Sequence, residues 1–549
     1  MINDADCALS GEPPPDLMKI PYNEADASSV AIPSEVEREA LGLDFSRNLG
    51  QISRHSAVFF VGTLFTMAAG YLVKIYVARV LGAEQLGLYA LGMTLVSLTQ
   101  LVGTLGMPAT AARYVAVYNG AGKFAELRGF LTRSLGVITF LNLILSIALV
   151  LGGGWIARNL YHTPDLGRYL PFFAALVLLG ALNVFYSQVL AGFKDIAKRT
   201  VITNFIGSPL MIALTVLLLA LGTGMRGYLA AQVANSVVVV GLLAMAAWKL
   251  TPPAARISFS PLPPLDPEVL SFAAAALGMY ALDFLVSQAD KILLGVYLNP
   301  RVVGIYVLAS TLSAFVPIIL QSVNQIFAPV IADLHAQGRR EVLQKLFQTL
   351  TKWVLGLTLP LAFVLILFAR QLMRIFGPDF EAGWPVLVIG AVGQLVNCGV
   401  GSVGYLLLMS GNQRRLIRVQ FAMAGISVLV NISLIPLLGM VGAALAAACV
   451  NVCGNLWNLY EVRKALQISP YNRSYFALLI PAVCVAASLA LLRYWTATIG
   501  HQWLVIVMAL AVSYAVFAVI AVAFALDPDD RMIAGSAWVQ VRNGLKRGE

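Results

Sequence analysis

The feature that most constrains this chain is a series of apolar stretches, each long enough to cross a lipid bilayer as a helix. A membrane-spanning helix needs about 20 mostly apolar residues, because the hydrocarbon core is about 30 Å thick and holds no water to bond the backbone. The sequence predicts an all-α polytopic membrane protein with fourteen spans, at residues 56–78, 86–108, 134–152, 170–191, 201–221, 228–247, 270–295, 302–329, 353–370, 384–409, 416–437, 440–460, 475–494 and 502–525.

Composition excludes most other classes of protein. Of the 549 residues, 59% are hydrophobic and 12% are charged, and the mean hydropathy is +0.81. A soluble domain has about 25% charged residues, so a soluble enzyme and a disordered chain are excluded. The sequence pI near 9.4 does not indicate a nucleic-acid partner, because the basic residues lie between apolar runs. They are better explained as loop charges that orient a membrane protein.

The distribution of basic residues predicts the topology. If the N-terminus lies inside, 27 of the 37 Lys and Arg residues are cytoplasmic, eight are outside, and Lys74 and Lys291 lie within spans. Such an excess of inner positive charge is typical of cell-membrane proteins. We therefore expect both termini in the cytoplasm of a multi-pass protein of the cell (inner) membrane. The outer loops are short, and the longest covers about residues 370–383. The inner segments near 113–133 and 331–352 are longer and basic, and we expect them to lie near lipid headgroups.

An internal repeat indicates a two-fold architecture. Residues 74–91 align without a gap to residues 291–308, and six of eighteen positions are identical, among them Lys74/Lys291, Gly87/Gly304 and Tyr89/Tyr306. The likeness continues at Gly122-Lys123 and Gly338-Arg339, and near Asn235 and Asn451, so spans 1–6 repeat as spans 7–12. Because six is even, the halves share one orientation and should be related by a pseudo-two-fold axis along the membrane normal. That is a transporter arrangement, with the substrate site near the midplane between the halves.

These observations predict six regions along the chain. The first has ten acidic residues against three basic ones within residues 1–50, and we expect it to be disordered. The regions are an acidic cytoplasmic tail (1–53), an N-lobe of spans 1–6 (54–250), a Pro-rich cytoplasmic linker (251–269), a C-lobe of spans 7–12 (270–465), the additional spans 13–14 (474–525) and a basic cytoplasmic tail (526–549).

Charged residues inside spans are the first candidates for function, because they are unfavourable in hydrocarbon. Asp283 lies near the middle of span 7, and Asp290 lies seven residues later on the same helical face. Both are candidate coupling or cavity groups, although Asp290 could equally form a structural ion pair. Lys74 and Lys291 are equivalent in the repeat and are candidate substrate-binding residues for an anionic headgroup. The alternative for both lysines is that they snorkel to the outer headgroups.

Two arginines complete the candidate substrate-binding set, and catalytic motifs are missing. Arg79 and Arg113 lie at the two ends of the hairpin of spans 1 and 2, where Arg113 could also be a positive-inside anchor. No phosphate-binding Gly-rich loop, paired-carboxylate motif or nucleophile elbow is found. Cys449 and Cys453 are one helical turn apart, and packing explains them better than a metal. We expect no enzymatic activity, no cofactor and no metal.

The sequence resembles the polysaccharide transporter or oligosaccharide flippase family of bacteria and archaea. This family belongs to the superfamily that includes multidrug and toxin extruders and lipid II flippases, the multidrug/oligosaccharidyl-lipid/polysaccharide exporters. The likeness covers about residues 54–525. The motifs that carry it are Arg79–Tyr89, Asp290–Gly295, Val303–Tyr306, Phe327–Ala332, Phe376–Phe380 and Leu408–Asn412.

The resemblance implies two six-helix lobes around a cationic central cavity, with alternating access. It implies transfer of a polyprenyl-pyrophosphate-linked oligosaccharide, such as an O-antigen, capsule or exopolysaccharide repeat unit, from the inner to the outer leaflet. Spans 1, 2, 7 and 8 line the cavity in such proteins, which would place Lys74, Asp283, Asp290 and Lys291 near it. Membrane lipids and polysaccharide assembly proteins are the implied partners.

Two alternative functions stay open. One is a proton- or sodium-coupled multidrug or cation antiporter of the same fold, in which Asp283 and Asp290 would exchange protons. The other is a membrane-embedded polymerase or ligase acting on the same lipid, although such enzymes usually need large outer loops. The charge of the cavity should separate the first two, because a net positive cavity favours the flippase and a net negative one the antiporter.

Overall fold

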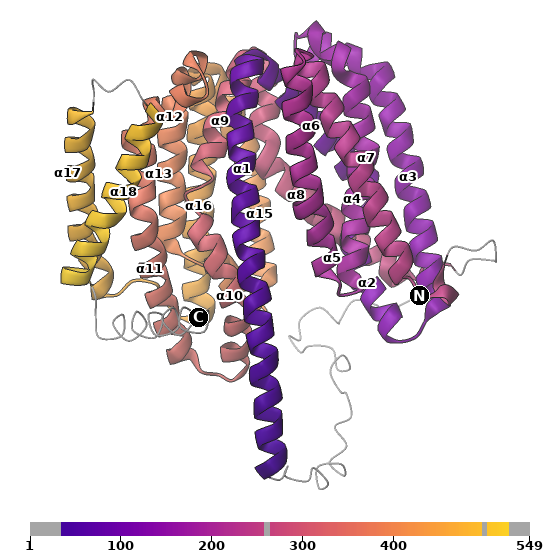
Figure 1. The fold of residues 1–549 in the computed structure, drawn as a ribbon, viewed down its shortest axis with the longest axis horizontal. Coiled ribbons are helices and arrows are strands. Elements are labelled where there is room, and N and C mark those ends of the chain that lie inside the picture. The colour runs from indigo at the N-terminus through magenta and orange to yellow at the C-terminus, as the bar shows by residue number, and fades with distance from the viewer. Residues whose placement is uncertain (1–34, 257–263, 497–501, 526–549) are drawn as a thin grey trace, which may run out of the picture. The chain divides into compact units, whose positions relative to one another are not determined.

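The computed structural model of the protein describes residues 35–256, 264–496 and 502–525, and every regular element in these ranges is a helix (Figure 1). Residues 1–34 of the acidic tail, 257–263 of the linker and the basic tail from 526 lie outside the described residues. The all-α polytopic prediction is confirmed. Within the described ranges, twelve helices are long and apolar enough to cross a membrane, and thirteen if the bent pair Pro300–Ser313 and Ile318–Ala336 forms one span.

The predicted number of fourteen spans depends on how the first long helix is divided. Helix α1 runs from Glu35 to Thr104 and contains the first predicted span and residues 86–104 of the second. Its backbone is non-helical at Gly82, where φ is 78° and ψ is 173°. A positive φ is available to glycine at little cost, so Gly82 is the natural break between the two spans. The number fourteen stays a prediction, because it requires α1 to count as two spans divided there, whereas the described helices give twelve or thirteen.

The N-lobe is a bundle in which α4 contacts α2, α3 and α7. Its elements after α1 are α2 (Met107–Gly120), α3 (Phe124–Trp155), a π turn (Ile156–Leu160), a 3₁₀ turn (Pro164–Tyr169), α4 (Leu170–Gly192), α5 (Ile196–Thr200), a π turn (Val201–Gly207), α6 (Ser208–Ala220) and α7 (Gly224–Leu250).

The C-lobe has the same order of elements, and α16 packs on α13 and α15. Its elements are α8 (Pro267–Tyr297), α9 (Pro300–Ser313), α10 (Ile318–Ala336), α11 (Arg340–Leu367), α12 (Ala369–Ile375), a 3₁₀ turn (Pro378–Gly383), α13 (Trp384–Val400), α14 (Val403–Met409), α15 (Gln413–Leu438) and α16 (Met440–Leu466). The last two helices, α17 (Leu479–Trp495) and α18 (Gln502–Ile520), pack together against α11 (Figure 1).

Local geometry repeats between the lobes at equivalent positions. Gly122 and Gly338 both have φ of 67°, and each ends one helix just before the next begins. One six-residue 3₁₀ turn in each lobe, Pro164–Tyr169 and Pro378–Gly383, starts with Pro-Asp and leads directly into a helix. The basic segments near 113–133 and 331–352, which we expected to lie near lipid headgroups, are mostly helical and each contains one of these tight glycine turns.

The lobes differ most in their fifth spans. In the N-lobe this span contains the π turn Val201–Gly207, whereas its C-lobe equivalent, α15, is a regular α-helix through the same region. Pro209 follows the π turn and explains it, because a proline ring clashes with the carbonyl group four residues earlier in an α-helix. Such turns are frequent at functional sites, and this one lines a cavity described below.

The two lobes meet where two helical segments cross at repeat-equivalent glycines, Gly87 and Gly304. A Cβ atom added to Gly87 would overlap the carbonyl oxygen of Pro300, and one added to Gly304 would overlap that of Ala83. The same offset of 217 that relates Gly87 to Gly304 relates Ala83 to Pro300. The two contacts are therefore repeat-related copies of each other. The repeat predicts a pseudo-two-fold axis, and this pair of contacts is what such an axis passing between the two glycines would produce.

This crossing predicts that Gly87→Ala and Gly304→Ala each destabilise the folded protein. Overpacking against a backbone that cannot rotate away typically costs about 1–3 kcal/mol, which exceeds the gain of up to about 1 kcal/mol from replacing a helical glycine by alanine. The thermal unfolding midpoint in detergent should fall for both variants. Gly241→Ala is the matched control, because nothing lies within 4 Å of its added Cβ. Equal midpoints for all three variants would contradict the close crossing.

The charge bias predicts the sidedness of the chain. In a background without native cysteines, cysteines replacing Gly120 and Gln413 should react with an impermeant maleimide only from the cytoplasm. A cysteine replacing Asp165 should react only from outside. All three positions are exposed, so access and not burial decides the result. Labelling of all three from one side of intact cells would reject the topology.

Candidate functional site

Each lobe contains one polar cavity at an equivalent place. The N-lobe cavity has a volume of about 320 Å³ and lies between α1, the π turn with α6, and α7. The C-lobe cavity has a volume of about 340 Å³ and lies between α8, α13, α15 and α16. In both lobes the first, fifth and sixth spans therefore form the walls. Both volumes fall within the range of about 300–1,000 Å³ that is typical of ligand pockets.

The N-lobe cavity is cationic. Lys74 lines it, and its ammonium group lies 4.7 Å from the centre of the Tyr71 ring. Among the described residues, no carboxylate forms an ion pair with Lys74. The buried Thr215 hydroxyl and Asn235 carbonyl oxygen also belong to lining residues and have no hydrogen-bond partner. The Lys74 ammonium and the Thr215 hydroxyl can each donate to an anionic group, whereas the Asn235 carbonyl oxygen can only accept, for example from a sugar hydroxyl.

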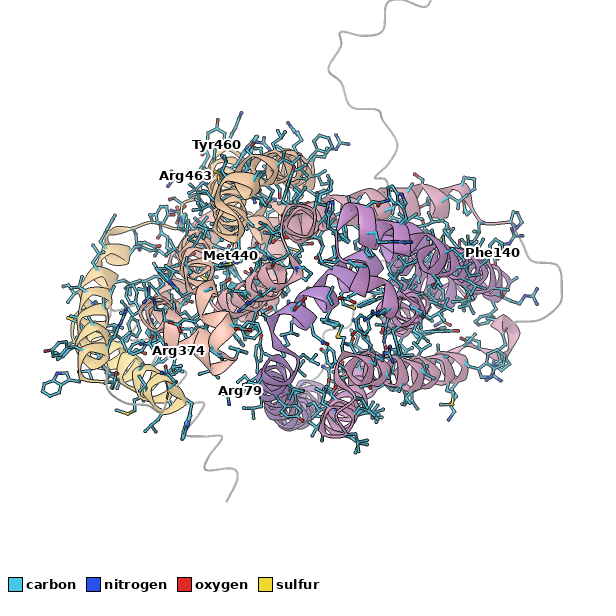
Figure 2. All side chains as sticks on the ribbon, turned by 90° about the horizontal axis from the view of Figure 1, so that it is seen from above. Arg79, Phe140, Arg374, Met440, Tyr460 and Arg463 are labelled. Carbon is cyan, nitrogen blue, oxygen red and sulfur yellow. The ribbon has the colours of Figure 1, made fainter. Side chains whose placement is uncertain are left out.

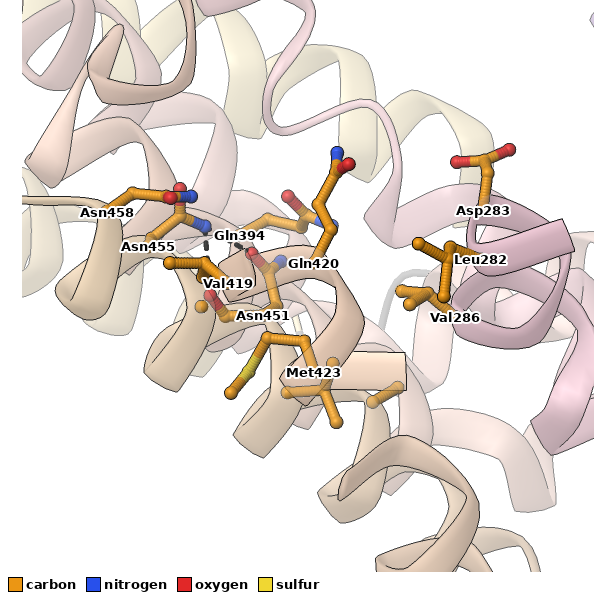
Figure 3. Close-up of a pocket in the computed structure, with 13 residues that line it drawn as sticks. Leu282, Asp283, Val286, Gln394, Val419, Gln420, Met423, Asn451, Asn455 and Asn458 are labelled. Atoms are coloured by element: carbon orange, nitrogen blue, oxygen red, sulfur yellow. Dashed lines mark hydrogen bonds between the residues drawn. The ribbon is translucent and has the colours of Figure 1, made fainter. Parts of the chain in front are cut away.

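The C-lobe cavity has different chemistry. Carboxamide side chains occupy one side of it, and Asp283 approaches from α8 on the other side (Figure 3). Asn455 donates to the main-chain oxygen of Asn451 at 2.9 Å and to its side-chain oxygen at 2.6 Å. The side-chain oxygen of Asn458 is buried without a partner. The carboxamides that line the cavity are Gln394, Gln420, Asn451, Asn455 and Asn458.

A third cavity, of about 280 Å³, lies between the lobes. Its walls come from α1, α2 and α4 of the N-lobe and from α8 of the C-lobe, with polar side chains from both lobes that include Gln100 and Gln288. Asp283 lines this cavity as well as the C-lobe cavity, and it has no ion-pair partner among the described residues. The carboxylate of Asp283 therefore stands where the C-lobe cavity adjoins the space between the lobes.

Asp290 and Lys291 occupy a different environment from Asp283. Asp290 accepts a hydrogen bond of 2.5 Å from the hydroxyl of Tyr306, so it ties α8 to α9. The ammonium group of Lys291 donates to the main-chain oxygen of Ser287 at 3.2 Å and to the side-chain oxygen of Gln288 at 2.8 Å. Neither residue lines the three cavities described above. In this structure Lys74 and Lys291 thus do not share one cavity.

Arg79 and Arg113 connect the lobes. Arg79 donates to the main-chain oxygen of Ile375 at 2.7 Å, at the end of α12. Figure 2 labels Arg79 and Arg374, the residue before Ile375. The guanidinium of Arg113 lies 3.6 Å from the carboxylate of Glu268 and 4.8 Å from the Phe272 ring centre. Neither arginine lines the three cavities, so both act here as links between lobes at opposite ends of spans 1 and 2.

Tyr114 reinforces the link made by Arg113. Its hydroxyl donates to the Glu268 carboxylate at 3.2 Å. Burial raises the pKa of the Tyr114 hydroxyl above its ordinary value, and the neighbouring carboxylate raises it further. The hydroxyl therefore remains a hydrogen-bond donor at neutral pH.

The carboxamide row of α16 is the part of the site that sequence reasoning missed. Asn451, Asn455 and Asn458 recur at intervals of four and three residues, which places them on one face of a helix. Three amides on one face of an apolar span are a recognisable signal, because each needs a polar partner in hydrocarbon. The search for charged residues alone overlooked it.

Comparison with protein families and with curated proteins gives consistent matches. The family model described as "Polysaccharide biosynthesis protein" matches residues 52–335, just over half of the chain, and the MatE model matches residues 275–412. Two curated relatives come from Haloferax volcanii. The "Probable flippase AglR" is 24% identical over 77% of this chain and 86% of its own length. The "Probable low-salt glycan biosynthesis flippase Agl15" is 22% identical over 72% of this chain and 80% of its own length.

Solved structures with the same fold are membrane transporters. The lipid II flippase MurJ, in an inward closed conformation, superposes with a TM-score of 0.65 at 13% identity, over 84% of this chain and 98% of its own. An inward-facing multidrug resistance transporter of the MATE family, in the MOP superfamily, gives a TM-score of 0.58 at 16% identity, over 74% of this chain and 94% of its own. At these identities the likeness establishes the fold alone.

The different surroundings of Asp283 and Asp290 predict different reactivity of cysteines placed there. Asp283→Cys should react quickly with a charged methanethiosulfonate reagent, because it lines two cavities. Asp290→Cys should react at least about tenfold more slowly, because position 290 is only partly exposed and lines no described cavity. Leu285→Cys is the matched control, since Leu285 is exposed on the same helix but lines no described cavity. Equal rates at positions 283 and 290 would contradict this assignment.

Proposed function

We propose that this chain, which belongs to the polysaccharide biosynthesis protein family, is a flippase for a polyprenyl-diphosphate-linked oligosaccharide. The observation that supports this most directly is the N-lobe cavity, where Lys74 and unused polar atoms lie inside a membrane-spanning bundle. The two curated relatives named as probable flippases add support. The proposed substrate is an O-antigen, capsule or exopolysaccharide repeat unit, carried from the cytoplasmic to the outer leaflet of the cell membrane.

The physical task of such a protein is to replace water around a polar headgroup. A diphosphate and its sugars cannot cross a hydrocarbon layer of about 30 Å without hydrogen-bonding partners and opposing charge. Lys74 offers a point charge for the diphosphate, and Thr215 offers a hydroxyl donor. The polyprenyl tail needs no such site, because it stays in lipid throughout. The protein therefore has to enclose only the polar end of its substrate.

Alternating access is the proposed route. The lobes are joined by Arg79 and Ile375 at the predicted outer end and by Arg113 and Glu268 at the predicted cytoplasmic end. We infer that the cytoplasmic link opens to admit the headgroup and that the outer link opens to release it. Membrane lipids and the assembly proteins of the polysaccharide are the partners that this route implies.

A cation antiporter is the second candidate, and one observation favours it. The MatE model matches residues 275–412, and Asp283 supplies an exposed carboxylate to two cavities. The net charge of the cavities does not separate the two candidates, because the two lobes differ. Lys74 makes the N-lobe cavity positive, and Asp283 makes the C-lobe cavity negative. The names of the curated relatives and the longer match to the polysaccharide family favour the flippase.

Reconstitution tests the proposal. Liposomes would contain the full-length protein and a fluorescent polyprenyl-diphosphate-linked oligosaccharide, with a lectin added outside. The lectin-accessible fraction should rise with time above that of protein-free liposomes. No rise, together with export of ethidium driven by a proton gradient in the same vesicles, would replace the flippase by the antiporter.

The same assay gives a prediction for the lysines. Lys74→Ala should lower the initial rate by on the order of tenfold, or about 1.4 kcal/mol of transition-state stabilisation, whereas Lys74→Arg should retain most activity. Lys249→Ala is the matched control, because Lys249 lies on α7 and lines no described cavity. If Lys74 and Lys291 contact one diphosphate during transport, the double alanine variant should differ from the sum of the single effects. Wild-type rates for the double variant would exclude both lysines.

A further inference from the structure

We propose that the C-lobe cavity is a sugar-binding site, in which the carboxamides of α16 bind glycan hydroxyl groups while the diphosphate binds at the Lys74 cavity. This inference rests on the proposed function and adds a division of the headgroup between the two lobes. It concerns a cavity lined by five carboxamides, one carboxylate and several apolar side chains.

The carboxamide row is arranged to present polar atoms to the cavity. Asn451, Asn455 and Asn458 share one face of α16, and the hydrogen bonds from Asn455 to Asn451 hold the first two in place (Figure 3). The side-chain oxygen of Asn458 has no partner although it is buried. A buried acceptor without a partner costs about 1–3 kcal/mol, so a ligand that satisfies it gains binding energy.

Sugars match this set of groups. Each carboxamide has two donors and one acceptor oxygen, and each sugar hydroxyl both donates and accepts, so pairs of hydrogen bonds can form in either direction. Leu282 and Val286 lie across the cavity beside Asp283, and Met423 lies on the carboxamide side (Figure 3). These apolar side chains can pack against the C–H groups of a sugar ring. The volume of about 340 Å³ is enough for a small polar ligand.

The diphosphate is excluded from this cavity by charge. The described residues that line it include the carboxylate of Asp283 and no basic side chain. Two like charges 4 Å apart repel by about 1–4 kcal/mol in a wet or partly wet site. Lys74 gives the N-lobe cavity a positive charge instead. The diphosphate therefore prefers the N-lobe cavity, and the glycan prefers the C-lobe cavity.

The repeat shows that the carboxamide row is specific to the C-lobe. Asn451 corresponds to Asn235 at an offset of 216. At the same offset, Asn455 and Asn458 correspond to Val239 and Leu242, which are apolar and pack in the N-lobe core. The two equivalent cavities therefore have different chemistry. The additional amides are present in the lobe where the counterpart of Lys74, Lys291, does not line the cavity.

The C-lobe cavity adjoins the cavity between the lobes, because Asp283 borders both of them. A glycan bound among the carboxamides can therefore extend into the interlobe space. The carboxylate of Asp283 can accept hydrogen bonds from sugar hydroxyls at that passage.

Direct binding to the full-length protein in nanodiscs tests this division with two probes. One probe is the free glycan released by mild acid from total lipid-linked oligosaccharides of the cell that makes the protein, and the other is farnesyl diphosphate. The double variant Asn455→Leu and Asn458→Leu should bind the glycan at least about tenfold more weakly, and farnesyl diphosphate within about twofold of wild type. Lys74→Ala should show the reverse pattern.

Retained binding of farnesyl diphosphate shows that the double variant is folded, and Asn458→Ala provides a milder second variant. Asn183→Leu is the matched control, because Asn183 lies on α4 and lines no described cavity. Wild-type affinity of the double variant for the glycan overturns the sugar site. Binding of tetraphenylphosphonium that is lost in Asp283→Asn, with no glycan binding by wild type, also overturns it.

The liposome assay separates this inference from the proposed function. If the wild-type protein flips the lipid-linked oligosaccharide while the double variant binds free glycan normally, only the sugar site is wrong. If the wild-type protein does not flip it, the proposed function is wrong, whatever the glycan affinity.

Discussion

The backbone contact between Gly87 and Gly304 is the constraint on which the arrangement of the two lobes depends. Each glycine lies against the main chain of the other lobe, at Pro300 and Ala83, and no side chain fits at either position. Close approach of backbones through small residues is how helices associate in lipid, where apolar side chains gain little from each other. Because the contact is repeated by the internal symmetry, it sets an axis about which equivalent spans build equivalent cavities.

Equivalent cavities need not have equivalent chemistry. The scaffold of first, fifth and sixth spans recurs in both lobes, but Lys74 is present in one cavity and Asp283 with five carboxamides in the other. The π turn Val201–Gly207 adds a second difference, because it lines the N-lobe cavity and has no counterpart in α15. In such a fold, function depends on which side chains occupy the repeat-equivalent positions of the two lobes. Because these side chains differ, a symmetric fold can bind an asymmetric headgroup.

The sequence was sufficient for the architecture and insufficient for the partners of individual charges. Long apolar runs and the repeat around Lys74 and Lys291 predicted the helical fold, since both signals are patterns that can be found along the sequence itself. The placement of Arg79 at Ile375 and of Asp290 at Tyr306 could not be predicted, because these contacts depend on how separate helices pack. Charge alone identified Asp283, whereas the neutral row on α16 required attention to helical spacing.

The strengths of the interlobe contacts are consistent with a protein that changes shape. The Arg113–Glu268 pair is half exposed or more, and exposed pairs contribute about 0–1 kcal/mol. Arg79 makes one exposed hydrogen bond to a main-chain oxygen, which solvent can replace. The glycine crossing is different, because it is close-packed backbone that cannot relax around a larger side chain. Alternating access requires two conformations of comparable free energy. These are easier to reach when the weak contacts at the two ends of the lobes break and form in turn while the glycine crossing stays intact.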